Sequence, residues 1–161
     1  MKTILVQISE PSWTMQALHL ACALARNNAA QIILLRLMPV RHPSYLGSAF
    51  GNSPPTEQER HDMAEYAATA EDYGVELSIQ PMQCATVLGA LVDAADQLNV
   101  DAVFAHIHKS WIPYWHQFQT WDLRRQLSAA HRQLFTLDSP PQHKEYVPAI
   151  MIESSHTEAS K

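Results

Sequence analysis

The chain has 161 residues, of which 47% are hydrophobic and 17% are charged, and its net charge is −5 at pH 7. This length suits a single domain with a sizeable core, and the composition excludes a disordered chain. The 11 Lys and Arg residues are scattered and form no basic surface for DNA or RNA. Because no apolar run approaches the roughly 18 residues of a membrane span, we expect a cytoplasmic protein with no nucleic-acid partner and no membrane contact.

The first third of the chain predicts two strands and one helix. Residues 3–8 are a short apolar run, typical of a strand that is buried on both faces. A proline and a serine that can serve as N-cap then open a helix over residues 11–28. Its apolar residues recur at helical spacing: Ala17, Leu20, Ala21, Leu24 and Ala25. Residues 31–40 (QIILLRLMPV) predict the second strand, and residues 41–55, rich in Pro, Gly and Ser, predict a long loop.

The next segment carries clear start and stop signals. Thr56 and Glu59 have the spacing of a capping box, so a helix is expected to begin there, and Gly74 is suited to end it. Apolar and polar residues then alternate from residue 75 onward, as in an edge strand. Pro81 is expected to close that strand.

Two further strands and two further helices complete the pattern. Thr86 is the N-cap of a helix that extends to about residue 98, and residues 101–105 (DAVFA) predict the fourth strand. A last helix is expected from about residue 121 to 130, followed by a fifth strand at 133–137. Strands that alternate with helices predict an open parallel five-stranded α/β sheet of Rossmann-like type, with helices on both faces.

The C-terminal residues predict an appendage to this domain. Residues 1–138 form the predicted domain, and residues 139–161 form an arm and a disordered tail. The arm begins with Ser-Pro-Pro, and its apolar run at 145–152 (EYVPAIMI) contains a proline. Because proline is excluded from the middle of a sheet, this run suits an extra edge strand or an arm on a partner subunit.

The segment from residue 106 to residue 121 (HIHKSWIPYWHQFQTW) follows the fourth strand, where a ligand-binding loop would lie. It contains no glycine, and the last glycine of the chain is Gly89. A phosphate-binding loop needs residues without a Cβ, because only these let several backbone N–H groups converge on the anion. We interpret its aromatic residues as an interface or a plug, with a pocket for a planar ligand as the alternative: Trp111, Tyr114, Trp115, Phe118 and Trp121.

Taken in order, these segments resemble the universal stress protein family over residues 1–138. The resemblance is carried by the opening KTILVQIS and by LLRLMPV, YGVELSIQP, QLNVDAVFA and LSAAHRQLFTL. It implies a domain of the universal stress protein and adenine nucleotide alpha hydrolase type. It also implies a homodimer, formed through the last-strand region and assisted by the C-terminal arm.

Nucleotide-binding members of that family have an acidic residue at the end of the first strand and a glycine pattern after the fourth. Here Ser9 stands at the acidic position, and the first two glycine positions fall on Ala105 and His108. Thr120 alone could replace the phosphate-binding hydroxyl, near the expected start of the last helix, where free N–H groups offer a weak anion site. The tentative ligand-binding residues are therefore Ser9, Val40, Ala105, His106, His108 and Thr120.

We expect a non-catalytic binding or regulatory module with a degenerate nucleotide site and no cofactor, which binds a small molecule, a nucleotide or a protein. The alternative is an ATP-binding, weakly hydrolysing protein that uses Ser9, Thr120 and the loop at 41–55. A third hypothesis is a metal site formed by His106, His108 and His116. The segment 106–121 contains no acidic residue, and no cysteine lies near it in the sequence. The serines lack the G-x-S-x-G pattern of an esterase.

Overall fold

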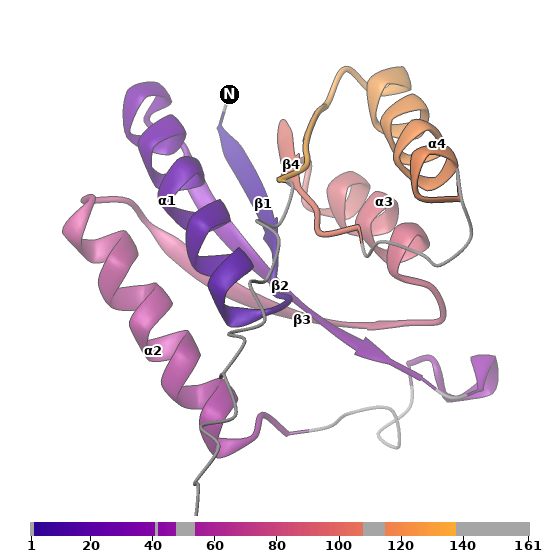
Figure 1. Cartoon of the computed structure of the whole chain (residues 1–161), viewed down its shortest axis with the longest axis horizontal. Helices are drawn as coiled ribbons and strands as arrows, with labels where there is room; N and C mark the ends of the chain where they lie inside the picture. The colour runs from indigo at the N-terminus through magenta and orange to yellow at the C-terminus, as the bar shows by residue number, and fades with distance from the viewer. Residues whose placement is uncertain (1, 41, 48–53, 108–114, 138–161) are drawn as a thin grey trace, which may run out of the picture.

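The computed structural model of the protein describes residues 2–40, 42–47, 54–107 and 115–137. These residues form a parallel five-stranded sheet in the order β3-β2-β1-β4-β5 (Figure 1). The strands are β1 Thr3–Gln7, β2 Gln31–Pro39, β3 Leu77–Cys84, β4 Ala102–Phe104 and β5 Gln133–Phe135. The helices are α1 Pro11–Asn28, α2 Glu57–Asp72, α3 Val87–Gln97 and α4 Trp115–Ala129, with a short 3-10 helix η1 at Pro43–Tyr45. The predicted α/β class and strand number are confirmed.

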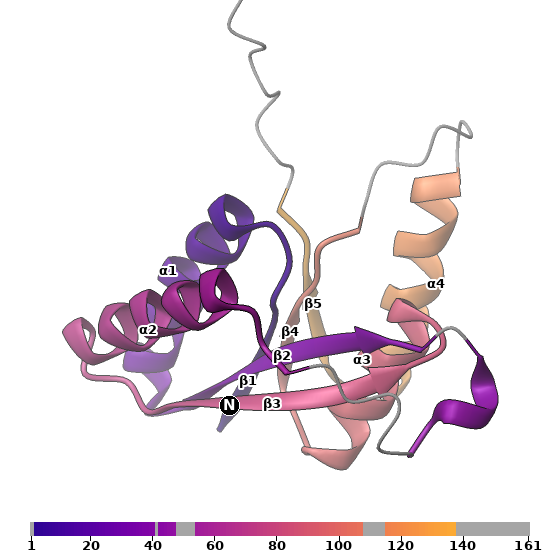
Figure 2. The same ribbon diagram turned by 90° about the horizontal axis from the view of Figure 1, so that it is seen from below.

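Helices cover both faces of the sheet, because the strands are apolar on both sides. Ile4 and Val6 of β1 pack with α1 and α2, whereas Leu5 between them packs with α3 and α4. Figures 1 and 2 show the two helix pairs on opposite sides of the sheet. Burial on both faces explains why β1 and β2 read as continuous apolar runs rather than as alternating ones.

The order of the strands creates a switch point beside β1. From β1 the chain proceeds to β2 and β3 on one side, then returns to place β4 and β5 on the other. The connections that leave β1 and β4 therefore lead to helices on opposite faces, α1 and α4. A crevice between the carboxyl ends of two such strands is where open α/β sheets bind ligands.

The predicted edge strand is confirmed, but its predicted end at Pro81 is wrong. β3 continues to Cys84, and Pro81 pairs with Arg36 of β2. An edge strand needs hydrogen-bond donors on one side only, so it can accommodate a proline that a central strand could not.

The predicted start of the last helix is also wrong. α4 begins at Trp115, six residues before the expected position. Residues 115–120 contain neither glycine nor proline, so nothing local stops the helix that Leu123 and Leu127 anchor in the core. The predicted C-terminal strand or arm at 139–161 lies outside the described residues.

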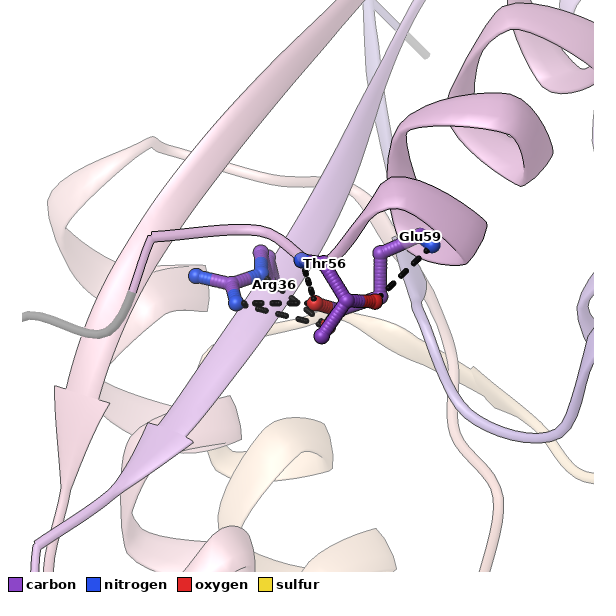
Figure 3. A network of polar contacts seen from close by, with 3 residues as sticks. All are labelled: Arg36, Thr56 and Glu59. Atoms are coloured by element: carbon purple, nitrogen blue, oxygen red, sulfur yellow. Dashed lines mark hydrogen bonds and ion pairs between the residues drawn. The ribbon is translucent and has the colours of Figure 1, made fainter.

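Three of the four capping signals behave as predicted, but the predicted serine N-cap of α1 is wrong, because the N-cap residue is Glu10 and no side chain caps this helix. Thr56 Oγ1 accepts the N–H of Glu59 at 3.1 Å, and Glu59 Oε2 accepts the N–H of Thr56 at 2.7 Å. Glu59 also receives the guanidinium of Arg36 from β2, at 3.2 Å (Figure 3). Gly74 adopts the positive φ of 67° that ends α2, and Thr86 caps α3.

Asp101 connects the beginnings of β1 and β4, and we predict an effect that depends on pH. Its Oδ2 accepts the N–H groups of Lys2 at 2.6 Å and Thr3 at 3.1 Å. These backbone hydrogen bonds lower the pKa of the Asp101 carboxyl below its ordinary value of 3.8. Because the pKa is lower in the folded state, the stabilisation is present above pH 3.8 and is lost as the pH falls through the folded-state pKa.

Asp101→Ala should therefore lower the free energy of unfolding by about 1 kcal/mol at pH 7, and by less in acid. Urea unfolding of the wild type and the variant at pH 7 and at pH 3 measures the loss of unfolding free energy at each pH. Asp101→Asn, which keeps an acceptor oxygen in place, should lose less. A loss that is equal at the two pH values would contradict this role of the carboxylate.

Candidate functional site

The carboxyl ends of β1 and β4 bring together residues that are far apart in the sequence. β1 pairs with β4 through Ile4, Leu5 and Val6. Beyond β1, the N–H of Ile8 still donates to the carbonyl of Leu35, and Ser9 follows directly. Beyond β4, Ala105 donates to Phe135, and His106 comes next. Ser9 and His106 are therefore the residues that directly follow the last sheet hydrogen bonds of β1 and β4 at this edge.

Ser9 and His106 form a direct hydrogen bond across the switch point. Ser9 Oγ lies 2.6 Å from His106 Nδ1. The N–H of Ser9 donates to Oγ1 of the buried Thr14 at 2.9 Å, and the N–H of His106 donates to Oε1 of the buried Gln7 at 2.9 Å. Each member of the pair is thus positioned by a buried polar side chain of β1 or α1.

The indole of Trp13 covers one face of the His106 imidazole. The ring centroids are 4.9 Å apart, and the ring planes meet at 22°. Trp13 is 2% exposed and His106 is 9% exposed. Trp13 Nε1 donates to the carbonyl of Leu137 at 3.3 Å, and this hydrogen bond holds the indole in place. The stacked rings therefore join α1, which follows β1, to the segment that follows β4.

The surroundings of Ser9 and His106 favour a structural role for this pair over a catalytic one. A serine hydrogen-bonded to a histidine has the geometry of a nucleophile with its base. However, the His106 ring is nearly buried and stacked on Trp13, so a substrate would first have to displace that ring.

Comparison with solved structures supports the resemblance seen in the sequence. A universal stress protein in complex with cAMP matches with a TM-score of 0.62 and 13% identity, over 86% of this chain and 98% of that chain. A universal stress protein family member from Burkholderia pseudomallei matches with a TM-score of 0.56 and 18% identity, over 86% and 96% of the two chains. The universal stress protein from Archaeoglobus fulgidus in complex with dAMP gives 0.50 and 14%, over 86% and 98%. The chain has the universal stress protein fold.

The likeness lies in the fold. No family model matches the sequence, and no curated protein matches it significantly. No helix among the described residues is both long and apolar enough to cross a membrane.

The other predicted site residues do not all gather at the switch point. Ala105 is fully buried in the core under α3 and α4. Val40 follows β2 five residues beyond Leu35, the partner of the last β1 residue, and its N–H donates to Cys84. Thr120 lies within α4, so the predicted anion site at a helix N-terminus near Thr120 is wrong, because the helix begins at Trp115. His108 lies outside the described residues.

The aromatic segment is only partly described. Phe118 and Trp121 lie on the outer side of α4, 55% and 56% exposed, and the Arg125 guanidinium lies 5.5 Å from the Trp121 ring centroid. These two rings are therefore no plug of the crevice, and a role in a subunit interface stays a prediction. The part of the chain that the structure describes contains no cluster of three potential metal ligands. The proposed histidine site includes His108 and is not tested by this.

Sequence reasoning missed Trp13, Thr14 and Gln7. A signal for Trp13 was present, since it extends the stripe of Ala17 and Ala21 backward by one helical turn. Gln7 gave no signal, because a polar residue at the end of a buried strand has no distinctive pattern.

Proposed function

We propose that this protein is a non-catalytic binding or regulatory module of the universal stress protein type, whose nucleotide site is degenerate. The observation that carries the proposal is the stack of Trp13 on His106, with Ser9 bonded to the imidazole. In this arrangement the side chains of Ser9, Trp13 and His106 pack together beside the switch point, which is where open α/β sheets hold their ligands.

The energetics oppose a bound triphosphate. Entry would have to separate two stacked rings, worth about 0.5 to 1.5 kcal/mol beyond burial, and to break the hydrogen bond between Ser9 and His106. In the sequence, Ala105 and His108 occupy the first two glycine positions of the family's phosphate-binding pattern, so the chain lacks there the residues without a Cβ that let backbone N–H groups converge. Each charge-assisted hydrogen bond that is not formed forgoes about 1.5 to 3 kcal/mol.

A second candidate is a nucleotide-binding module with a modified phosphate site. It is favoured by the solved neighbours that hold cAMP and dAMP. Each of these ligands has a single phosphate group, which requires fewer backbone donors than a triphosphate does. Ser9 and Thr120 would supply hydroxyl groups in this version.

Calorimetric titration separates the two candidates. The protein is titrated in turn with Mg-ATP, cAMP and dAMP. If the nucleotide site is degenerate, the titration with Mg-ATP should give no saturable heat. Stoichiometric Mg-ATP binding to the wild-type chain would overturn the proposal. Saturable binding of cAMP or dAMP that Thr120→Ala abolishes would establish the second candidate instead.

A further inference from the structure

An open, mainly apolar groove lies between α1 and the residues that follow β5. Its volume is about 450 Å³. It is lined by Gln16, His19, Leu20, Thr136 and Leu137. We propose that this groove is the docking site of the C-terminal segment 145–152 (EYVPAIMI) of the same chain. The proposal concerns a contact between two parts of the chain and does not depend on whether the protein binds a nucleotide.

Leu20 shows that the groove exposes apolar surface that the described core does not use. In the sequence, Leu20 belongs to the apolar residues that recur at helical spacing in α1, together with Ala17 and Ala21. Ala17 and Ala21 are fully buried, whereas Leu20 is 51% exposed. At the end of β5, Phe135 and Leu137 are likewise only partly buried against the core. Covering this surface with a further apolar segment would therefore stabilise the protein.

The segment 145–152 begins close to the groove, because the described chain ends there. Leu137 lines the groove, and its carbonyl accepts the indole N–H of Trp13 at 3.3 Å. Seven residues, 138–144, separate Leu137 from the segment. Fully extended, seven residues span at most about 25 Å. This length lets the segment return to a groove that begins where the connection begins.

The composition of the segment matches that of the groove. Residues 146–152 contain no charged side chain, and the described residues that line the groove include no Asp, Glu, Lys or Arg. Pro148 has no N–H, so pairing of the segment along the edge of β5 would lack a hydrogen bond. Side-chain contacts in a groove do not need that donor. The groove therefore suits the segment better than the edge of the sheet does.

The covalent connection favours the segment of the same chain over that of a second copy. A short linker that can span the distance gives an effective concentration in the millimolar range. A second copy at micromolar concentration supplies the same segment at a concentration about a thousandfold lower. We therefore expect the groove to be filled within each chain.

The experiment measures paramagnetic broadening in the ¹⁵N-labelled full-length chain. A nitroxide is attached to the Ala149→Cys variant, and both native cysteines are buried, so the label reacts at the new site. The amide signals of His19 and Leu20 should be strongly broadened. In Leu20→Glu, which places a charge in the groove, most of the broadening at His19 should be lost. Val87→Glu is the matched control, because it places the same charge at an exposed apolar position of α3, and it should leave the broadening unchanged.

A mixing experiment shows which chain supplies the segment. ¹⁵N-labelled chain without the nitroxide is mixed with nitroxide-labelled chain without ¹⁵N, and the signals of His19 and Leu20 should keep their full intensity. Broadening in this mixture would mean that a second copy fills the groove, and it would overturn the proposal.

Two results with the nitroxide-labelled chain itself would also overturn the proposal. One is the absence of broadening at His19 and Leu20. The other is broadening that Leu20→Glu does not reduce, because it would come from a segment that passes near the groove without binding in it. If Leu20→Glu does not fold, Ile150→Glu, which places the charge on the segment instead, provides the same decision.

Discussion

Trp13→Ala should lower the free energy of unfolding by about 3 to 5 kcal/mol. The indole is 2% exposed and belongs to the core cluster between the sheet and the pair α1 and α2. Its removal leaves a cavity, and it also removes the stack on His106 and the hydrogen bond to Leu137. Urea unfolding of the full chain, followed by far-ultraviolet circular dichroism, measures the loss.

Trp121→Ala is the matched control, since it removes the same side chain from the surface. Trp121 is 56% exposed, and its aromatic contact with Arg125 is worth only about 0.5 to 1 kcal/mol. We expect the two losses to differ by at least about 2 kcal/mol. Similar losses for the two variants would mean that the indole of Trp13 is not the core residue described above.

The contrast between these tryptophans shows where sequence reasoning succeeded and where it failed. Three of the four tryptophans lie in the segment 106–121, where the sequence predicts a functional region. The tryptophan that meets the crevice is the fourth, Trp13. Its position depends on how α1 docks on the sheet, and that packing is set by contacts between distant segments rather than by local pattern.

Three of the four capping signals were predicted correctly, because the interactions that form them are local. The capping box of Thr56 and Glu59, the cap at Thr86 and the positive φ of Gly74 each involve residues within one turn. The end of β3 and the start of α4 were misread. Pro81 is tolerated only because β3 is an edge strand, which depends on the strand order.

Ser9 and His106 show how far the site could be predicted. Both were candidates because each follows a predicted strand, but they are 97 residues apart in the chain. Their direct hydrogen bond requires β1 and β4 to be neighbours, with the switch point between them. The alternation of strands and helices in the sequence predicts a parallel sheet, but it does not determine the strand order and therefore does not show which side chains are in contact.

Glu59→Ala should lower the free energy of unfolding by about 2 kcal/mol, more than the roughly 1 kcal/mol expected for the loss of a helix cap alone. Glu59 accepts the N–H of Thr56 at 2.7 Å and the guanidinium of Arg36 at 3.2 Å (Figure 3). The Arg36 side chain is only 11% exposed, whereas that of Glu59 is 41% exposed. Truncation of Glu59 therefore removes an ion-pair partner from a largely buried guanidinium.

A double-mutant cycle separates the ion pair from the cap. Arg36→Met keeps most of the apolar volume of the arginine, and Glu59→Gln keeps an acceptor for the N–H of Thr56. If the buried charge dominates, Glu59→Gln should cost less when Arg36 is already methionine. Equal costs in the two backgrounds would show that Glu59 acts through the cap alone.

The pH dependence of the same pair provides an independent check. The pKa of Glu59 lies below its ordinary value of 4.5, first because its carboxylate accepts the backbone N–H of Thr56 and then because Arg36 hydrogen-bonds to it. The stabilisation is therefore present above pH 4.5 and is lost as the pH falls through the folded-state pKa. The wild type and Glu59→Ala should converge in stability in acid, because protonation removes the charge that the substitution removes. Persistence of the full difference at pH 3 would instead mean that Glu59 stabilises the fold through packing of its side chain, and Arg36 would then tolerate a neutral neighbour at the α2 N-terminus.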